Sequence, residues 1–338
     1  MGIAVNGRFR SHTVTGVQRY ALEITERLGD RVRVIEPDKP KGRIAGHAWE
    51  QFALPQKVTG ELLWSPSNTG PLSVPSQVVT LHDLSFIDYP RGYSKAFLSW
   101  YRWLIPRLVK RVRHLITVSE FSKERIETVF NIPSSKITVI PEAVGSLFRP
   151  QNDSEVQATL SRYHLSRPYL LFLGGGNRRK NFVTLAKVWP ALSQSFKEID
   201  LVVVGSPASL YRKNRLPKLP RLKVVPHAPD SDLPALYQGA RCFVYPSLYE
   251  GFGLPILEAM ACGTPVVASN TTALPETGKD AALWVPPQDA EKLAQTLRSV
   301  LESSALRREF QEKGLLHAST FSWDTVAETT YQTLLRNL

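Results

Sequence analysis

The 338-residue sequence contains only two cysteines, Cys242 and Cys262. Both lie in apolar segments and they form no CxxC motif, which argues against a disulfide scaffold or a catalytic thiol. We expect two buried free thiols in a reducing compartment. No apolar run approaches the roughly 20 residues that a membrane-spanning helix needs. The opening residues, MGIAVNG, look like a strand and lack the basic start and apolar stretch of a signal peptide, so we expect a cytoplasmic protein.

Acidic residues are in the minority: the formal net charge is +12 and the isoelectric point is near 9.7. Residues 1–150 carry 21 Lys and Arg against 13 Asp and Glu, so the first half is the more basic. This imbalance favours an anionic partner such as a diphosphate, a membrane surface or a nucleic acid. Charge alone does not choose among the three.

The length suits two domains of ordinary size. Short β-branched apolar runs recur along the chain with helical patterns between most of them. Because the runs are almost wholly apolar and do not alternate, they are typical of parallel strands covered by helices on both faces. The sequence therefore predicts two doubly wound α/β domains. The expected strands are 2–7, 32–37, 61–67, 77–83, 114–120 and 137–143 in the first half, and 169–176, 201–207, 222–228, 242–248, 264–270 and 282–288 in the second.

A turn-rich passage, PEAVGSLFRPQND, separates the halves at residues 141–153. We expect a first domain over 1–150, a second over 151–320, and a closing helix over 321–338 that packs back on the first. Ser322 is the expected N-cap of that helix.

The most informative segment is EGFGLPILEAMACGTPVVAS, residues 250–269. Glu250 falls on a loop after an expected strand, and Glu258 about one turn inside a helix with Pro255 in its first turn. Gly253 lets the backbone approach a ligand closely, and amides at a helix start favour anions and hydroxyls. The pattern suits a hydroxyl-rich or phosphorylated ligand. The alternative is a solvated helix start with two ordinary surface acids.

A second segment, LFLGGGNRRKNF, places a glycine-rich turn at Gly174 before the basic residues Arg178, Arg179 and Lys180. A turn of this kind ahead of a helix suits a diphosphate. The alternative is a tight turn with a solvated basic cluster.

Two residues of the first half are further candidates. Thr15 can cap a helix that begins near Gly16, and that glycine would let the helix start approach a ligand. His82 ends an expected strand, where a lone histidine is more often structural.

Taken together, these segments resemble the GT4 family of retaining glycosyltransferases, which have the GT-B fold. The resemblance covers nearly the whole chain and rests on TGVQRYALEI, HDLSFIDYP, LITVSEFSKERI, RKNF, LPALYQGARCFVYPSLYEGFGLP and the signature EGFGLPxLEAMAxGxPVVAS. It implies two Rossmann-like domains that face each other across a cleft, with the sugar donor between them.

The resemblance also implies roles for the acidic signature. Glu258 corresponds to the acid that binds the nucleotide ribose hydroxyls, and Glu250 to the acid beside the donor sugar. The amides around Phe252, Gly253 and Leu254 correspond to those that hold sugar hydroxyls and phosphate.

Arg179 and Lys180 correspond to the basic pair that binds the donor phosphates, Gly16 to the glycine beside them, and His82 to a histidine of the sugar subsite. The predicted catalytic residues are thus Glu250, His82, Lys180 and Arg179. The glycine-rich loop departs from the family, which commonly has Glu-Pro before the basic pair where this sequence has Gly-Gly-Asn-Arg. The resemblance therefore leaves open which basic residue contacts which phosphate.

Two further segments invite other interpretations. Residues 141–145 read PEAVG where relatives commonly carry Pro-Asn-Gly. The triplet Asp230-Ser231-Asp232 looks like the DxD metal motif of the other glycosyltransferase fold, but it precedes LPALYQGA and is better interpreted as a helix cap. We expect no metal and no cofactor.

The segment 94–116 combines aromatic and basic residues. It suits a peripheral contact with an anionic membrane, or equally a core helix with a solvated basic face whose pattern Pro106 interrupts. The residues concerned are Phe97, Trp100, Tyr101, Trp103, Lys95, Arg102, Arg107, Lys110, Arg111 and Arg113.

The sequence thus predicts a metal-independent hexosyltransferase that uses a nucleotide diphosphate sugar, with GDP-mannose as the first candidate. The expected acceptor is a glycan hydroxyl, on a lipid-linked saccharide of surface polysaccharide assembly. Alternatives are another GT-B enzyme, such as a glucosyl- or rhamnosyltransferase, a phosphorylase or a sucrose-type synthase, or a non-enzymatic basic binder of membranes or nucleic acids. No nucleic-acid motif is present.

Overall fold

The computed structural model describes residues 2–11, 16–37, 42–174, 176–205 and 218–338. The chain separates into two compact units, residues 1–143 together with 322–338, and residues 144–321. Between β6 and α7, residues 140–152 form neither helix nor strand. The expected cap Thr15 lies outside the described residues.

The first unit contains a six-stranded parallel sheet of order β2-β1-β3-β4-β5-β6. The register pairs Ala4 of β1 with Leu63 of β3. The strands are β1 (Ile3–Asn6), β2 (Arg33–Ile35), β3 (Leu62–Ser65), β4 (Gln77–Thr80), β5 (His114–Thr117) and β6 (Ile137–Val139).

The second unit contains another six-stranded parallel sheet, of order β12-β11-β10-β7-β8-β9. Its strands are β7 (Tyr169–Leu173), β8 (Asp200–Val204), β9 (Leu222–Val225), β10 (Cys242–Tyr245), β11 (Val266–Ser269) and β12 (Leu283–Val285). Each of the twelve expected strands overlaps its predicted run, β8 beginning one residue earlier, and the doubly wound α/β architecture is confirmed.

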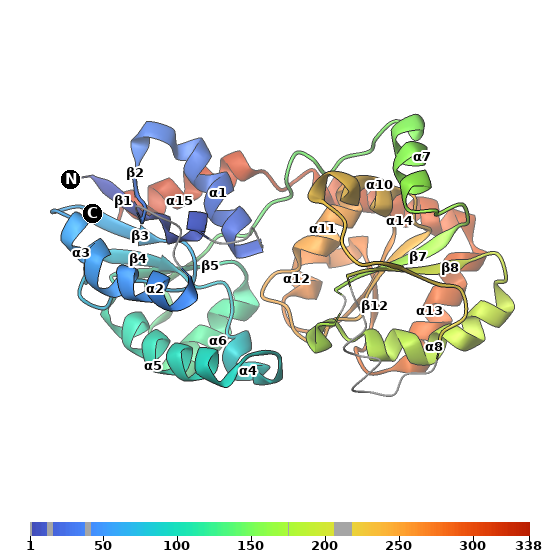
Figure 1. Ribbon diagram of the computed structural model, residues 1–338, viewed down its shortest axis with the longest axis horizontal. Helices are drawn as coiled ribbons and strands as arrows, with labels where there is room; N and C mark the ends of the chain where they lie inside the picture. Colours follow the sequence, from blue (N-terminus) through green and yellow to red (C-terminus); the bar gives the residue numbers. More distant parts are fainter. Residues whose placement is uncertain (1, 12–15, 38–41, 175, 206–217) are drawn as a thin grey trace. The chain divides into compact units, whose positions relative to one another are not determined.

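Helices lie on both faces of each sheet (Figure 1). Those of the first unit are α1 (Gly16–Leu28), α2 (Arg43–Ala48), α3 (Leu54–Lys57), α4 (Ser85–Asp88), α5 (Lys95–Arg111), α6 (Glu120–Phe130) and α15 (Trp323–Leu335), with a π-helical turn η3 (Trp49–Ala53) between α2 and α3. Those of the second are α7 (Asp153–Arg162), α8 (Phe182–Ser195), α10 (Leu233–Gln238), α11 (Leu254–Ala261), α12 (Leu274–Gly278), α13 (Ala290–Glu302) and α14 (Ser304–Ala318).

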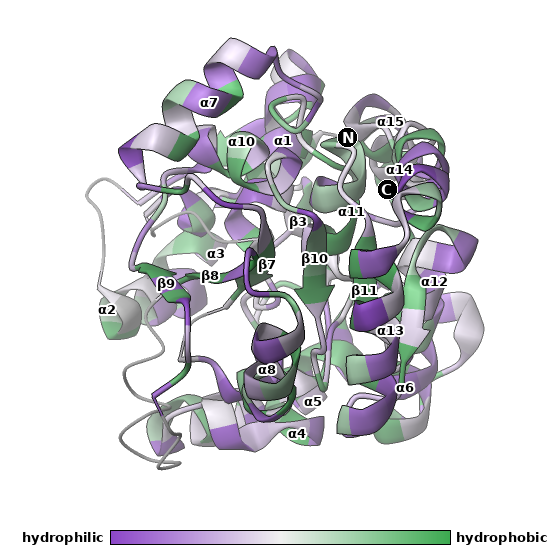
Figure 2. Ribbon diagram, turned by 90° about the vertical axis from the view of Figure 1, so that its right-hand side faces the viewer, coloured by the Kyte–Doolittle hydropathy of each residue, from purple (hydrophilic) through white to green (hydrophobic). Residues whose placement is uncertain are grey.

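The strands are apolar because both of their faces are covered. The strand β10 is hydrophobic along its length (Figure 2), and its four residues are all buried. One large core cluster of the second unit packs Leu170, Val203 and Val244 of the sheet against Trp189 of α8 and Leu297 of α13. Cys242 is buried in this cluster as a free thiol, as expected, and Cys262 is likewise buried and free.

The closing helix α15 belongs to the first unit, where it lies beside α1 (Figure 1). Ser322 caps it, since its Oγ accepts a hydrogen bond from the amide of Asp324 at 3.2 Å. Arg27 of α1 donates to the Asp324 carboxylate at 2.7 Å. Helix α15 thus holds the C-terminal residues against α1.

The triplet Asp230-Ser231-Asp232, predicted as a helix cap, lies directly before α10 with Asp232 at the N-cap position, but the Asp232 side chain makes no capping bond. The Asp232 carboxylate instead accepts hydrogen bonds from Arg162 of α7 and from Tyr163, which follows that helix, both at 2.7 Å. Because its carboxylate bonds to these two residues and not to the start of α10, Asp232 connects the start of α10 to the end of α7.

Helix α5 continues through Pro106 to Arg111. Its inner face, including Leu104, Ile105, Leu108 and Val109, is buried, while its basic residues are exposed. Within the described residues, no helix has both the length and the apolar character to cross a membrane.

Candidate active site

The topology of the second sheet brings two loops together. From β7 the chain runs outward to β8 and β9, and then returns so that β10 pairs with the other side of β7. The carboxyl ends of β7 and β10 therefore border a topological switch point, the usual ligand site of such sheets. Gly174 and Lys180 follow β7, and Glu250 follows β10.

Glu250 is the centre of a buried polar cluster at this point, with 6% of its surface exposed. Its Oε1 atom accepts hydrogen bonds from Lys180 Nζ at 2.7 Å, Tyr245 OH at 2.9 Å and Ser247 Oγ at 2.5 Å. Arg179 Nη1 lies 3.6 Å from the other oxygen, Oε2. The predicted residues Glu250, Arg179 and Lys180 thus meet in one place.

The cluster keeps Glu250 ionised. Burial would raise the pKa of this carboxyl, but the charges of Lys180 and Arg179 outweigh that effect and lower the pKa to about 2. Burial lowers the pKa of Lys180, and the Glu250 charge opposes this. The pKa of Tyr245 is raised well above its ordinary value, first by burial and then by Glu250. At neutral pH the site therefore holds a carboxylate and a neutral phenol, and Glu250 is no proton donor.

Gly174 shapes the position of Lys180. Its φ of +136° favours glycine, and a Cβ atom added there would lie 2.5 Å from Lys180 Cγ. The Lys180 side chain therefore passes directly over Gly174, and any larger residue at position 174 would clash with it.

The basic turn itself, η6 (Arg178–Lys180), is tied to the neighbouring loop. Asn177 caps it by accepting from the Arg179 amide at 3.0 Å. Asn181, buried and at φ +58°, donates to the carbonyl of Pro246 at 2.9 Å. These bonds fix the basic residues relative to the loop that carries Glu250.

Glu258 lies within α11 and is also buried, with 8% of its surface exposed. Tyr237 donates a hydrogen bond to its Oε2 at 3.0 Å. Gly253 precedes the helix at φ +112°, where a Cβ atom would lie 2.6 Å from Leu274 Cδ2. The helix start therefore requires glycine on both conformational and steric grounds.

Phe252 and Leu254 flank that glycine. The Phe252 side chain is buried and packs edge-on against Phe321, with ring centroids 6.2 Å apart. Its carbonyl accepts a hydrogen bond from Thr277 Oγ1 at 2.7 Å. The Phe252 ring is thus used for packing within the second unit.

A pocket of about 350 Å³ adjoins Gly174 at the carboxyl ends of β7, β8 and β9. Gly205, Pro226 and His227 contribute to its lining. Of these lining residues the sequence singles out Gly174 as a candidate, whereas Pro226 and His227 stand at the end of an expected strand without any motif.

The first unit holds the remaining predicted residues, Gly16 and His82. Gly16 begins α1, and a Cβ atom there would meet nothing within 4 Å. Local packing therefore gives no reason for a glycine at this position.

His82 is buried within the first unit's own polar groups. Its Nδ1 lies 3.0 Å from Glu142 Oε1 and its Nε2 lies 3.1 Å from the carbonyl oxygen of Pro66. Its amide donates to Asn68 Oδ1 at 2.8 Å, and Tyr20 packs edge-on against the ring. Both ring nitrogens are thus engaged, and the partner Glu142 belongs to the PEAVG segment that departs from the family.

Among the described residues, no group of three or more His, Cys, Asp and Glu side chains lies close enough to hold a metal ion. The positive charges nearest Glu250 come from Lys180 and Arg179.

The fold identifies the class of protein to which this chain belongs. Over 99% of this chain and 100% of the other, the structure is similar to Anabaena Alr3699/HepE in complex with UDP-glucose, with a TM-score of 0.77 at 17% identity. The two doubly wound sheets are those of the GT-B glycosyltransferases.

Sequence comparison then gives the family. Residues 161–316 match the Glycosyl transferases group 1 family, and residues 62–145 match Glycosyltransferase Family 4. O-antigen chain mannosyltransferase B of Escherichia coli is 33% identical over 75% of this chain and 68% of its own length. O-antigen chain mannosyltransferase RfbU of Salmonella typhimurium is 30% identical over 71% of this chain and 65% of its own length. The chain therefore belongs to the GT4 family and is a glycosyltransferase.

Proposed function

We propose that this glycosyltransferase moves mannose from GDP-mannose to a hydroxyl of a growing glycan, with retention at the anomeric carbon. The names of its relatives support the choice of sugar and of a surface polysaccharide as product. We further propose that the acceptor is a lipid-linked saccharide at the inner face of the cell membrane.

The observation that carries the proposal is the Glu250 cluster at the switch point. Lys180 and Arg179 together bring two positive charges to one carboxylate, which leaves a net positive site for a diphosphate. Glu258, one helix turn inside α11, would hold the ribose hydroxyls. The 350 Å³ pocket beside Gly174 falls in the range of small-molecule sites and would take the nucleoside.

The chemical difficulty of the reaction is the charge that builds on the departing diphosphate. Lys180, Arg179 and the amides at the start of α11 would stabilise it, and fixed positive groups in a buried site act strongly on developing charge. We propose that they replace a divalent metal.

Glu250 is a poor nucleophile in this arrangement. Its Oε1 accepts three hydrogen bonds, and Arg179 faces its Oε2. We therefore assign it to positioning and charge stabilisation beside the sugar and propose no covalent sugar–enzyme intermediate.

A thermal-shift screen across nucleoside diphosphates and their sugars tests the donor. GDP and GDP-mannose should raise the melting temperature most, and NMR of the product should show a retained anomeric configuration. Lys180→Gln should abolish the shift, whereas Lys187→Gln, an exposed lysine of α8, should preserve it. Stabilisation by UDP or dTDP sugars alone would overturn the choice of donor, and cleavage that requires inorganic phosphate would favour a phosphorylase.

A further inference from the structure

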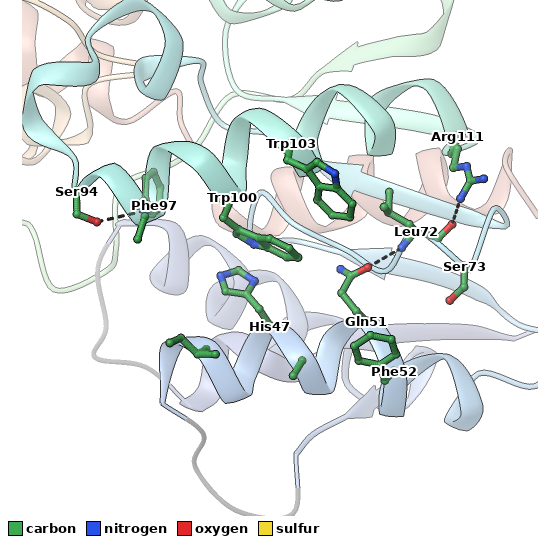
Figure 3. Close-up of a pocket in the computed structure, with 13 residues that line it drawn as sticks. His47, Gln51, Phe52, Leu72, Ser73, Ser94, Phe97, Trp100, Trp103 and Arg111 are labelled. Carbon is green, nitrogen blue, oxygen red and sulfur yellow. Dashed lines mark hydrogen bonds between the residues drawn. The ribbon is translucent and has the colours of Figure 1, made fainter.

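The first unit contains an apolar groove that takes no part in the proposed transfer site. Its volume is about 740 Å³. One wall is formed by α2 and the π-helical turn η3, and the other by α5 (Figure 3). His47 and Phe52 project from the first wall, and Trp100 and Trp103 from the second. The groove is large enough for an extended ligand portion.

Large apolar side chains are exposed at this groove. Ile44 is 88% exposed, Phe52 74% and Trp103 44%. Trp100 and Trp103 stack with ring centroids 5.2 Å apart, which makes a flat aromatic surface. Clustered exposed apolar groups of this kind mark sites of protein or membrane interaction.

The side-chain amide of Gln51, which lines the groove, is already hydrogen-bonded within the protein. Gln51 donates to the carbonyl of Gly70 at 2.9 Å and accepts from the Leu72 amide at 3.1 Å. His47 Nδ1 lies 3.5 Å from the buried carboxylate of Glu50. A hydrocarbon chain in the groove would therefore leave the two Gln51 hydrogen bonds intact.

The helix that forms the second wall is strongly basic and contains no acidic residue. Its five cations are exposed: Lys95, Arg102, Arg107, Lys110 and Arg111. Arg107 lies over the Trp103 ring at 4.9 Å, and Arg111 itself lines the groove. The 17 residues of α5 span about 25 Å, so these charges are spread over more length than one phosphate group can neutralise.

We propose that this groove is a lipid-chain site through which the first unit docks on an anionic bilayer. The acyl chain of a phospholipid enters between α2 and α5, while the cations of α5 contact several phosphates of the surface. A second copy of this chain fits less well, because it would bring two basic helices together. The inference goes beyond the proposed transfer reaction and does not depend on it.

The test measures binding to vesicles of phosphatidylglycerol and phosphatidylcholine. Sedimentation gives the affinity, and acyl chains brominated near the headgroup report contact by quenching tryptophan fluorescence. The wild type should bind, show quenching, and bind less at high salt. Phe52→Ser should reduce binding by about tenfold and remove most of the quenching, because burial of an aromatic side chain contributes at least that factor. Leu316→Ser is the matched control, since Leu316 of α14 is also 74% exposed but lies in the second unit.

Three results would overturn the proposal. One is unchanged binding and quenching in Phe52→Ser, which would make the contact purely electrostatic. Another is an equal loss in Leu316→Ser. The third is a concentration-dependent dimer in sedimentation equilibrium that Phe52→Ser dissociates. Hydrolysis of GDP-mannose, measured without vesicles, separates the two proposals. Phe52→Ser should leave the rate of hydrolysis unchanged. A wild-type protein that does not hydrolyse GDP-mannose would count against the proposed donor and not against the lipid site.

Discussion

Replacing Glu250 by Gln removes the negative charge at the centre of the candidate site. The pKa of this carboxyl is lowered from 4.5 to about 2, and each pKa unit corresponds to about 1.4 kcal/mol. The ionised form thus contributes about 3 kcal/mol to stability at pH 7. Because the folded pKa is depressed, this contribution is complete above pH 4.5 and is lost as the pH falls toward 2.

Differential scanning calorimetry of wild type and Glu250→Gln at pH 7 and pH 3 measures the effect. In the second unit, about 3 kcal/mol corresponds to a melting temperature lower by roughly 6–12 °C at pH 7. The difference should shrink by about 2 kcal/mol in free energy at pH 3, where an unfolded glutamate is mostly protonated. Glu309→Gln is the control, because its ion pair with Lys313 is exposed and such surface pairs contribute little to stability. Equal melting temperatures for the two variants at pH 7 would refute the reasoning, because the desolvation of Glu250 would then cancel its attraction to Lys180 and Arg179.

The same variant separates catalysis from binding. Glu250 is proposed to lie beside the donor sugar and contacts two cations, Lys180 and Arg179, that are proposed to bind the phosphates. Its loss should therefore lower kcat while the affinity for GDP does not fall. Steady-state kinetics with calorimetry on GDP would show this. A loss of GDP affinity at unchanged kcat would place Glu250 in nucleotide binding instead.

Three further changes test the surroundings of this carboxylate. Gly174→Ala should displace Lys180 and weaken GDP binding by about tenfold in calorimetry, consistent with one lost charged hydrogen bond, whereas Gly92→Ala, at an open position, should not. Glu258→Gln should raise the donor KM by about tenfold to a hundredfold with little change in kcat, because ribose is held equally before and during transfer; a kcat defect alone would contradict that role. Transfer should survive EDTA, and a loss that magnesium or manganese restores would show that the basic residues do not replace a metal.

The sheets could be predicted from sequence because each strand is buried on both faces. A run such as CFVY has no other simple interpretation between two helical patterns. The gathering of Arg179, Lys180 and Glu250 could also be predicted, since their loops follow strands that meet at a switch point. Tyr245 could not be singled out, because it falls inside the apolar run and its hydroxyl has no distinctive pattern there.

Side-chain partners that come from distant segments could not be predicted. Asp232 has the spacing of a helix cap, yet Arg162 and Tyr163, about 70 residues away, take its carboxylate. Glu142 lies in the turn-rich passage that follows β6, and only the structure shows that its Oε1 lies 3.0 Å from Nδ1 of His82. In both cases the sequence specifies a polar group, and the tertiary fold decides which partner it meets.

The structure also distinguishes among the three consecutive basic residues, of which the resemblance singles out Arg179 and Lys180 without saying which contacts which phosphate. They form a 3-10 turn with about three residues per turn, so their side chains point in three directions and cannot all face one ligand. Lys180 bonds Glu250 Oε1, Arg179 faces Oε2, and Arg178 is exposed. The two inward residues therefore approach opposite oxygens of one carboxylate. That arrangement fixes the separation of the Lys180 and Arg179 charges. Because the Lys180 side chain also passes over Gly174, its position depends most on the glycine-rich turn.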